Sequence, residues 1–178
     1  MPEIGELFDQ LVQEKKSKNL PPVATWKPSN IGKIDIFIDC LGDWYHEGQP
    51  IKRQEIINLF STILRKDEDG YCLVTPYEKL IIEVEDVPFI VVEMASRGEN
   101  EERELIFRTN VNDVITADNN HKLWVTNAKE EPRPYLHIRS GLNALLSRPV
   151  YYQLIELCIW DDGNCYIYSA NTRFDLLS

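Results

Sequence analysis

Hydrophobic residues recur at the helical period in several segments of the chain. The pattern predicts an amphipathic helix over residues 3–16 and a second helix over residues 53–65, where an apolar stripe lies opposite the polar positions. Residues 141–146 and 149–158 are also expected to be helical, because Pro149 suits a first helical turn, in which its missing N–H is not needed. Helices are therefore expected in both halves of the chain.

Between these helices, apolar and polar residues alternate with the period of a β-strand. Ile34, Ile36 and Ile38 alternate with Asp35, Phe37 and Asp39, which predicts a strand with one buried face. The prolines between Leu20 and Pro28 predict an extended linker before it, because proline disfavours helix in the preceding residue. Further strands are expected over residues 71–75, 80–84, 89–94, 104–108, 114–116, 122–126 and 135–138.

A pattern of helix, turn and alternating strand occurs twice, over residues 50–80 and 149–177. The turn glycines Gly70 and Gly163 are separated by the same number of positions as the cysteines that follow them, which indicates duplication. Strands outnumber helices, and no alternation of strand, helix and strand is present. We therefore expect an α+β fold of two small β-rich halves related by duplication, with antiparallel sheets and packed helices.

Composition and charge narrow the classes of function. The chain of 178 residues is 43% hydrophobic and 27% charged, close to the average composition of soluble globular proteins. Its formal charge of −10 disfavours binding to nucleic acid or to an anionic membrane. The acidic start of the chain does not resemble a signal peptide, and no apolar stretch is long enough to span a membrane, so a cytoplasmic protein is expected.

Four cysteines, none in a CxxC pair, are interpreted as small buried apolar residues, with a redox role or a zinc site as the alternatives.

Several short motifs, in fixed order, carry a family resemblance. They include Leu20-Pro21-Pro22-Val23, Trp44-Tyr45-x-x-Gly48-x-Pro50-Ile51-x-Arg53, Leu73-Val74-Thr75-Pro76-x-Glu78-Lys79, Val84-Glu85-Asp86-x-Pro88-Phe89, Thr109-Asn110 and Arg148-Pro149-Val150-Tyr151-Tyr152. Over about residues 20 to 177 the chain closely resembles the uncharacterised bacterial family catalogued as the domain of unknown function 1285. One departure is Asn171, where family members tend to carry a nearby glycine; asparagine also tolerates left-handed φ.

The resemblance implies a cytoplasmic protein with a duplicated core, whose C-terminal half superficially resembles pleckstrin-homology folds. It divides the chain into an N-terminal helix (1–19), an N-terminal β-rich domain (20–95) and a C-terminal domain (96–178). It also implies a cleft between the domains that holds a nucleotide-like ligand, and a role in signal transduction.

Two arginines are the leading candidates for contact with such a ligand. Counted at 100° per residue, Arg53 falls within the apolar arc at the start of its helix, and Arg148 is placed alike at the later helix. A cation there loses hydration and meets the positive end of the helix dipole, and an anion would relieve both costs. The two guanidinium groups could form a clamp for phosphate or carboxylate. The alternatives are arginines that reach solvent, or ion pairs with Glu78, Glu85 or Asp86.

Polar loops supply further candidates. Thr75 and Lys79 lie in a loop between two strands, where they either present donors to a ligand or hold the turn and an ion pair. Thr109 and Asn110 end a strand, where they either bind nearby backbone or recognise a base edge. Tyr71, Tyr152 and Trp44 lie near these motifs; they either stack on a purine or belong to the core.

Catalytic motifs are weak. The three histidines show no nucleophile or zinc spacing, so no catalytic residue, metal ligand or cofactor is predicted. The sequence therefore predicts a non-enzymatic binding module that closes on a nucleotide-like anion and signals to a protein partner. One alternative is an interaction scaffold without a small ligand. Another is a metal-dependent phosphoesterase that uses Glu85 and Asp86.

Overall fold

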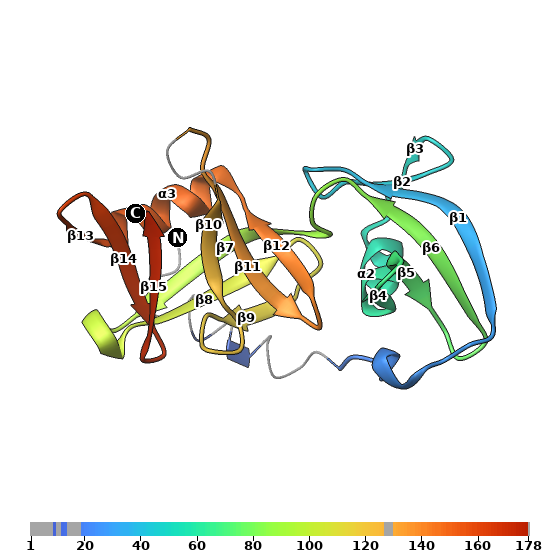
Figure 1. Ribbon diagram of the computed structural model, residues 1–178, viewed down its shortest axis with the longest axis horizontal. Coiled ribbons are helices and arrows are strands. Elements are labelled where there is room, and N and C mark those ends of the chain that lie inside the picture. Colours follow the sequence, from blue (N-terminus) through green and yellow to red (C-terminus); the bar gives the residue numbers. More distant parts are fainter. Residues whose placement is uncertain (1–8, 10–11, 14–18, 127–129, 178) are drawn as a thin grey trace. The chain divides into compact units, whose positions relative to one another are not determined.

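The computed structural model describes residues 9, 12–13, 19–126 and 130–177 (Figure 1). The chain forms two compact units. The first, the N-terminal unit, contains Asn19–Phe89 with Ser140–Leu142. The second, the C-terminal unit, contains the described residues of Ile90–Arg139 and Asn143–Ser178, together with Asp9, Val12 and Gln13. None of the described helices has the length and apolar composition that crossing a bilayer requires.

The N-terminal unit is a six-stranded sheet with one helix. Its elements are η1 (Val23–Thr25), β1 (Asn30–Ile38), β2 (Trp44–His46), β3 (Gln49–Pro50), α2 (Gln54–Thr62), β4 (Leu64–Asp67), β5 (Gly70–Val74) and β6 (Glu78–Val84). The strand order is β3-β2-β1-β6-β5-β4, and the only parallel pair in this described sheet is β1 with β6.

Helix α2 packs on one face of this sheet (Figure 1). Trp44 of β2 contacts Phe60 of α2, with 6.2 Å between the ring centroids. Ile36 and Ile38 are buried on the same side, as the alternation in β1 predicts. Residues 35, 37 and 39 therefore point to the opposite side, which we call the outer face.

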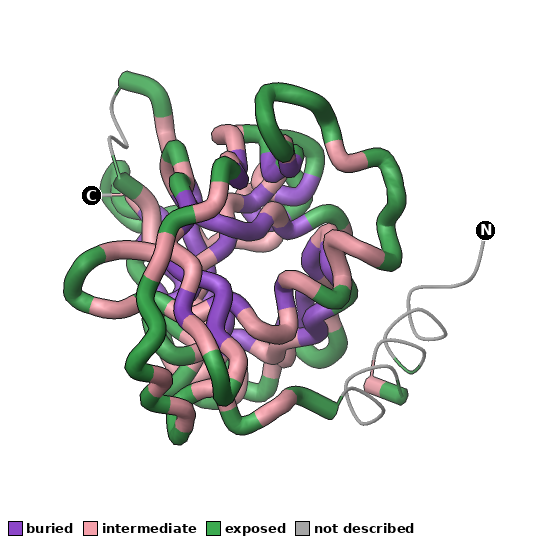
Figure 2. Tube along the Cα trace, turned by 90° about the vertical axis from the view of Figure 1, so that its right-hand side faces the viewer, coloured by how far each residue is buried: buried purple, intermediate pink, exposed green. Residues whose placement is uncertain are grey.

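The C-terminal unit has a second six-stranded sheet, of order β10-β11-β12-β7-β8-β9, and a three-stranded sheet, β13-β14-β15. Buried residues, purple in Figure 2, lie mainly in the strands. The elements are β7 (Phe89–Arg97), η2 (Asn100–Glu102), β8 (Glu104–Thr109), β9 (Val114–Thr116), β10 (Leu123–Thr126), β11 (Arg133–Arg139), β12 (Leu142–Leu146), α3 (Arg148–Leu157), β13 (Ile159–Asp161), β14 (Asn164–Ser169) and β15 (Thr172–Leu177).

The predicted fold class is confirmed: both units are β-rich, their sheets are mostly antiparallel, and α2 and α3 pack in the first and second unit respectively. The repeated pattern corresponds to a helix followed by three antiparallel strands, α2-β4-β5-β6 in one unit and α3-β13-β14-β15 in the other. Asn171 holds the last hairpin turn with φ of 59°, the left-handed conformation expected of it.

Two helix predictions need correction. Residues 141–146 are not helical, because Ser140 and Gly141 both have positive φ and form a tight hairpin turn that leads into strand β12. The helix predicted over residues 53–65 ends at Thr62, and Leu64 and Arg65 belong to β4, where they pair with β5. In both places, pairing with a neighbouring strand prevails over the local helical pattern.

Most of the helix predicted over residues 3–16 lies outside the described residues. Its described members, Asp9, Val12 and Gln13, are helical. Val12 packs against a buried cluster of Ala95 and Ile106 with a neighbouring valine of β9. The segment thus contributes at least one apolar contact to the C-terminal unit.

Candidate functional site

The outer face of the N-terminal sheet carries most of the polar side chains of that unit that have specific partners. Strand register fixes its members, because paired residues point to the same side. Phe37 pairs with Tyr45 on β2 and with Glu83 on β6. Further along the sheet, Arg65 pairs with Cys72. The face therefore extends from the β1–β2 hairpin to the β4–β5 hairpin.

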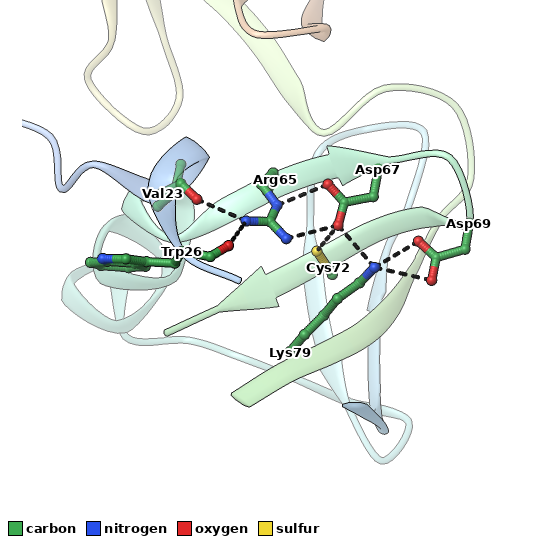
Figure 3. Close-up of polar contacts among 7 residues, drawn as sticks. All are labelled: Val23, Trp26, Arg65, Asp67, Asp69, Cys72 and Lys79. Atoms are coloured by element: carbon green, nitrogen blue, oxygen red, sulfur yellow. Dashed lines mark hydrogen bonds and ion pairs between the residues drawn. The ribbon is translucent and has the colours of Figure 1, made fainter. Parts of the chain in front are cut away.

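At the β4 end of this face, Arg65 ties the proline-rich linker to the sheet (Figure 3). Its Nη1 donates to the carbonyl oxygens of Val23 and Trp26, at 2.8 Å and 2.7 Å. Its Nε and Nη2 donate to the two carboxylate oxygens of Asp67, at 2.8 Å and 2.9 Å. The guanidinium is thus satisfied by a bidentate carboxylate and two backbone acceptors, an arrangement that fixes its position.

Lys79 joins the same network from β6 (Figure 3). Its Nζ lies 2.8 Å from Asp67 Oδ2 and 2.8 Å from Asp69 Oδ1. The Arg65 guanidinium, and then the Lys79 ammonium, lower the pKa of the Asp67 carboxyl. In turn, hydrogen bonds from Lys79 to Asp67 and Asp69 raise the pKa of the lysine. Arg65 and Lys79 are thus both neutralised by carboxylates of the same chain.

A broad depression of about 730 Å³ lies beside this network. Its lining comprises Lys66, Asp67, Glu68, Asp69 and Lys79, so acids outnumber bases. Lys79, predicted as a ligand-binding cation, is therefore engaged in internal ion pairs, which is the alternative that the sequence left open. The depression has no excess of positive charge with which to attract an anion.

The other end of the outer face contains a smaller hollow of about 340 Å³, lined by Asp35, Phe37, Asp39, Tyr45 and Gly48. The two rings pack together, with 6.2 Å between their centroids and 36° between their planes. They form an aromatic floor. Of the two carboxylates, that of Asp35 belongs to β1 and that of Asp39 directly follows this strand, on either side of Phe37. We call this feature the acidic hollow.

The two carboxylates of the acidic hollow differ in their bonding. Asp39 Oδ1 accepts hydrogen bonds from the backbone N–H groups of Leu41 and Asp43, and its Oδ2 accepts one from the Tyr45 hydroxyl. That hydrogen bond raises the pKa of Tyr45. Asp35 is exposed, and within the described part of the chain no hydrogen bond or ion pair is found for its carboxylate. Asp39 therefore holds the hairpin, and Asp35 is available to a ligand.

The acids continue on β6. Glu83 pairs with Phe37 in the sheet register and is exposed. Glu85 is also exposed, and its Oε2 accepts a hydrogen bond from the Cys40 N–H at 2.7 Å. Together with the acidic hollow, Glu83 and Glu85 form what we call the acidic face.

The premise that made Arg53 and Arg148 the leading candidates is wrong. Both residues are exposed. Arg53 is the N-cap of α2, with extended φ and ψ of −84° and 110°, so an angular count along the helix does not apply to it. Arg148 opens α3, directly after the N-cap Ser147. Neither guanidinium is stranded among apolar side chains, and a role in ligand binding stays a prediction for both.

The threonines and Asn110 have turn roles. Thr75 Oγ1 accepts hydrogen bonds from the backbone N–H groups of Tyr77 and Glu78. Thr109 is buried, and its hydroxyl accepts from the N–H of Asp113 at 3.1 Å. Asn110 Oδ1 accepts from the N–H of Ile90 at 3.0 Å. These contacts match the turn interpretation for all three residues.

The three predicted stacking residues lie in different surroundings. Trp44 is only 1% exposed and faces α2, so it belongs to the core. Tyr71 is half-buried beneath the Lys66 ammonium, 5.2 Å from its ring centroid, and burial raises its pKa. Tyr152 is 58% exposed on α3. The structure places Trp44 and Tyr71 in the N-terminal unit and Tyr152 in the C-terminal unit.

Sequence reasoning missed Asp35 and Phe37 as candidates for a site. Their signal was present, since the polar side of the alternation in β1 contains an aromatic residue between two aspartates. The partner ring of Tyr45 is brought to Phe37 by the register of the hairpin. That register depends on the turn at residues 39–43, where Asp39 binds two backbone N–H groups.

These features define an α+β protein of two β-rich units, with an acidic and aromatic surface on the first. Residues 21–87 match the N-terminal domain of the family described as "Domain of unknown function (DUF1285)", and residues 88–176 match its C-terminal domain. The chain belongs to this family. Its division into two matched domains fits the duplicated pattern.

Two solved structures are similar to the chain. A DUF1285 family protein from Silicibacter pomeroyi DSS-3 is 36% identical, with 94% of each chain covered and a TM-score of 0.85. A DUF1285 family protein from Shewanella baltica OS155 is 27% identical, with 68% of this chain and 90% of that chain covered and a TM-score of 0.53. Among curated proteins, none matches the chain.

Proposed function

We propose that the protein is a non-catalytic interaction module, which binds a positively charged segment of a protein partner on its acidic face. This is the scaffold function that the sequence left open, now assigned to a surface. The single observation that carries it is the acidic hollow, in which an aromatic floor and the unpaired carboxylate of Asp35 lie open to solvent.

The pairing of two cations on the outer face supports this assignment. Arg65 and Lys79 are bound by Asp67 and Asp69 at the opposite end of the sheet. A third cation of this face, Lys33 of β1, is exposed and pairs with Ile81 in the sheet register. Among the described residues, no Lys, Arg or His contributes to the lining of the acidic hollow. The formal charge of −10 adds a long-range attraction for a basic partner. A cation approaching this face therefore meets attraction at long range and unsatisfied acceptors at contact.

A nucleotide-like anionic ligand finds less support in the side chains of either unit. It depended on buried arginines at positions 53 and 148, and both are exposed. It also depended on a free charge at Lys79, which is paired. The proposed partner is a protein of the cytoplasm, the location that the sequence favours.

A basic peptide tests the proposal. We expect an unstructured peptide of alternating arginine and glycine to bind the full chain, with an affinity that falls as NaCl rises, measured by calorimetry. Reversing the acidic face with Asp35→Lys and Glu83→Lys should weaken binding about tenfold. The matched control, Glu101→Lys with Glu102→Lys, makes the same change in net charge on exposed residues of η2.

Equal loss of peptide binding in both double variants would refute the acidic face as the site, since net charge alone would then explain the attraction. A nucleotide panel in a thermal-shift assay provides the opposite test. A rise in Tm with a nucleotide, lost in the Arg53→Ala, Arg148→Ala double variant, would favour the anionic ligand instead.

A further inference from the structure

The side chains of the acidic hollow are suited to binding one planar cation. Its floor is the pair of rings of Phe37 and Tyr45, whose centroids lie 6.2 Å apart. Two parallel rings further apart could hold a cation between them, but these rings are neighbours tilted by 36°. A cation can therefore lie over the floor, where the ring faces attract positive charge.

The unpaired carboxylate of Asp35 stands at the edge of this floor. Asp35 and Phe37 are two residues apart on β1 and point to the same side, about 7 Å apart along the strand. A flat group that covers the Phe37 ring can direct N–H groups in its own plane toward that carboxylate. Gly48 lines another part of the rim, and an added Cβ there would meet no atom within 4 Å, so this side is open to an approaching chain.

We infer that the acidic hollow binds the guanidinium group of an arginine side chain from the protein partner, stacked on Phe37 and Tyr45 and hydrogen-bonded to Asp35. This inference rests on the proposed function and specifies the side chain that is recognised. Guanidinium is planar, carries its N–H donors at its edge and is weakly hydrated, so it can stack and form a bidentate bond together. A lysine ammonium is compact and strongly hydrated, so it cannot both stack on the rings and form a bidentate hydrogen bond.

Asp39 has a positioning role in this arrangement. Its carboxylate accepts from Leu41, Asp43 and Tyr45, so it holds the hairpin and the Tyr45 ring. The Tyr45 ring is thereby kept against Phe37, and the floor is formed before the ligand arrives. A preformed floor reduces the entropy lost on binding.

The test uses small probes and the full chain. Nα-acetyl-arginine amide should bind saturably and shift the backbone amide resonances of Asp35 and Gly48 in nuclear magnetic resonance spectra. The lysine analogue should bind about fivefold more weakly. The citrulline analogue has nearly the same shape without the charge, and should cause no saturable shift.

Variants assign the contacts. Asp35→Asn, a conservative change at an exposed site, should weaken binding of the arginine probe about tenfold. Phe37→Leu should weaken it about threefold, because it removes one ring face. Glu101→Gln is the matched control: it removes one charge from an exposed residue of η2, and should change affinity by about twofold or less. Circular dichroism confirms that each variant is folded.

Equal affinity for the arginine and lysine probes, or an unchanged affinity in Asp35→Asn, would overturn the guanidinium site. The two proposals can fail separately. If the basic peptide binds and loses affinity on reversal of the acidic face, while Asp35→Asn has no effect on the arginine probe, only the guanidinium site is refuted. If reversal of the face also has no effect, the proposed function is refuted as well.

Discussion

The same Arg-x-Asp pair occurs on a strand in each unit, with different surroundings. In the N-terminal unit, Arg65 and Asp67 lie on β4 with side chains that are 16% and 25% exposed. In the C-terminal unit, Arg173 and Asp175 lie on β15 with side chains that are 49% and 63% exposed. The Nε···Oδ1 distances are nearly equal, 2.8 Å and 2.9 Å. The Nε···Oδ1 contact is therefore shared. The second contact differs, since Arg65 Nη2 binds the other oxygen of Asp67 and Arg173 Nη2 binds the same oxygen of Asp175, and burial also differs.

The partners beyond the pair also differ. Arg65 binds two carbonyl oxygens from the linker, and Asp67 also binds Lys79. Arg173 lies over the ring of Tyr166, 3.8 Å from its centroid, on a solvent-facing strand pair. An exposed pair gains little because water solvates its ions well in the unfolded state. A half-buried pair that connects distant segments contributes more, since its loss leaves several polar groups without partners.

Replacement of the two arginines should show the largest difference. We expect Arg65→Met, which keeps most of the side-chain volume, to lower the free energy of unfolding by about 2 kcal/mol. Arg173→Met should lower it much less, because that pair is exposed. Urea denaturation of both variants measures the difference. Equal losses would show that burial does not distinguish the two pairs.

Replacement of the second cation tests whether the N-terminal network acts as a unit. Lys79→Met should cost about 1 kcal/mol, because Asp67 keeps Arg65 as a partner and Asp69 is half exposed. The double variant with Arg65→Met should cost more than the sum of the single variants, since Asp67 then loses both cations. Additive losses in a double-mutant cycle would contradict a shared network.

The free energy of unfolding should depend on pH in acid because Asp67 belongs to the network. The Arg65 guanidinium lowers the pKa of the Asp67 carboxyl below that of the unfolded chain, which is about 3.9. Its stabilising effect is therefore fully present above that pH and is lost as pH falls through the lower pKa of the folded state. Asp67→Asn should make stability less dependent on pH below about 4. The control is Asp175→Asn; a similar change in its acid unfolding curve would remove the distinction between the pairs.

Salt should produce the smallest effect. Raising NaCl from about 0.1 M to 1 M shortens the screening length from about 10 Å to about 3 Å. The loss of stability in Arg173→Met should then fall toward zero. The cost of Arg65→Met should change less, because its contacts are half-buried hydrogen bonds at short range. Repeating the urea titrations at both salt concentrations measures this.

The sequence was sufficient for the fold class and for the inward and outward sides of β1. Hydrophobic alternation placed Ile36 and Ile38 inside and Phe37 outside, because the period of a strand is a local property. It was insufficient at residues 141–146, where Leu142, Ala144 and Leu146 are buried at alternate positions. The turn at Ser140-Gly141 was the missed signal.

The candidate site was harder to predict than the fold. The argument for Arg53 depended on the exact start of α2, and a residue one position before the first helical turn does not follow the helical period. Lys79 was correctly seen to have two possible roles, but the acids that bind it come from another strand and its turn. The Phe37–Tyr45 contact depends on hairpin register, which one sequence does not fix.

The hydrogen bonds from Arg65 to the carbonyl oxygens of Val23 and Trp26 affect the choice of fragments for expression. A fragment of the N-terminal unit for expression should begin before Val23, although the sheet itself starts at Asn30. Cutting the chain at Asn30 would remove two backbone acceptors of a half-buried guanidinium. The proline-rich linker ahead of the first strand is thus a conformationally restricted segment that is hydrogen-bonded to the far strand of the sheet, β4.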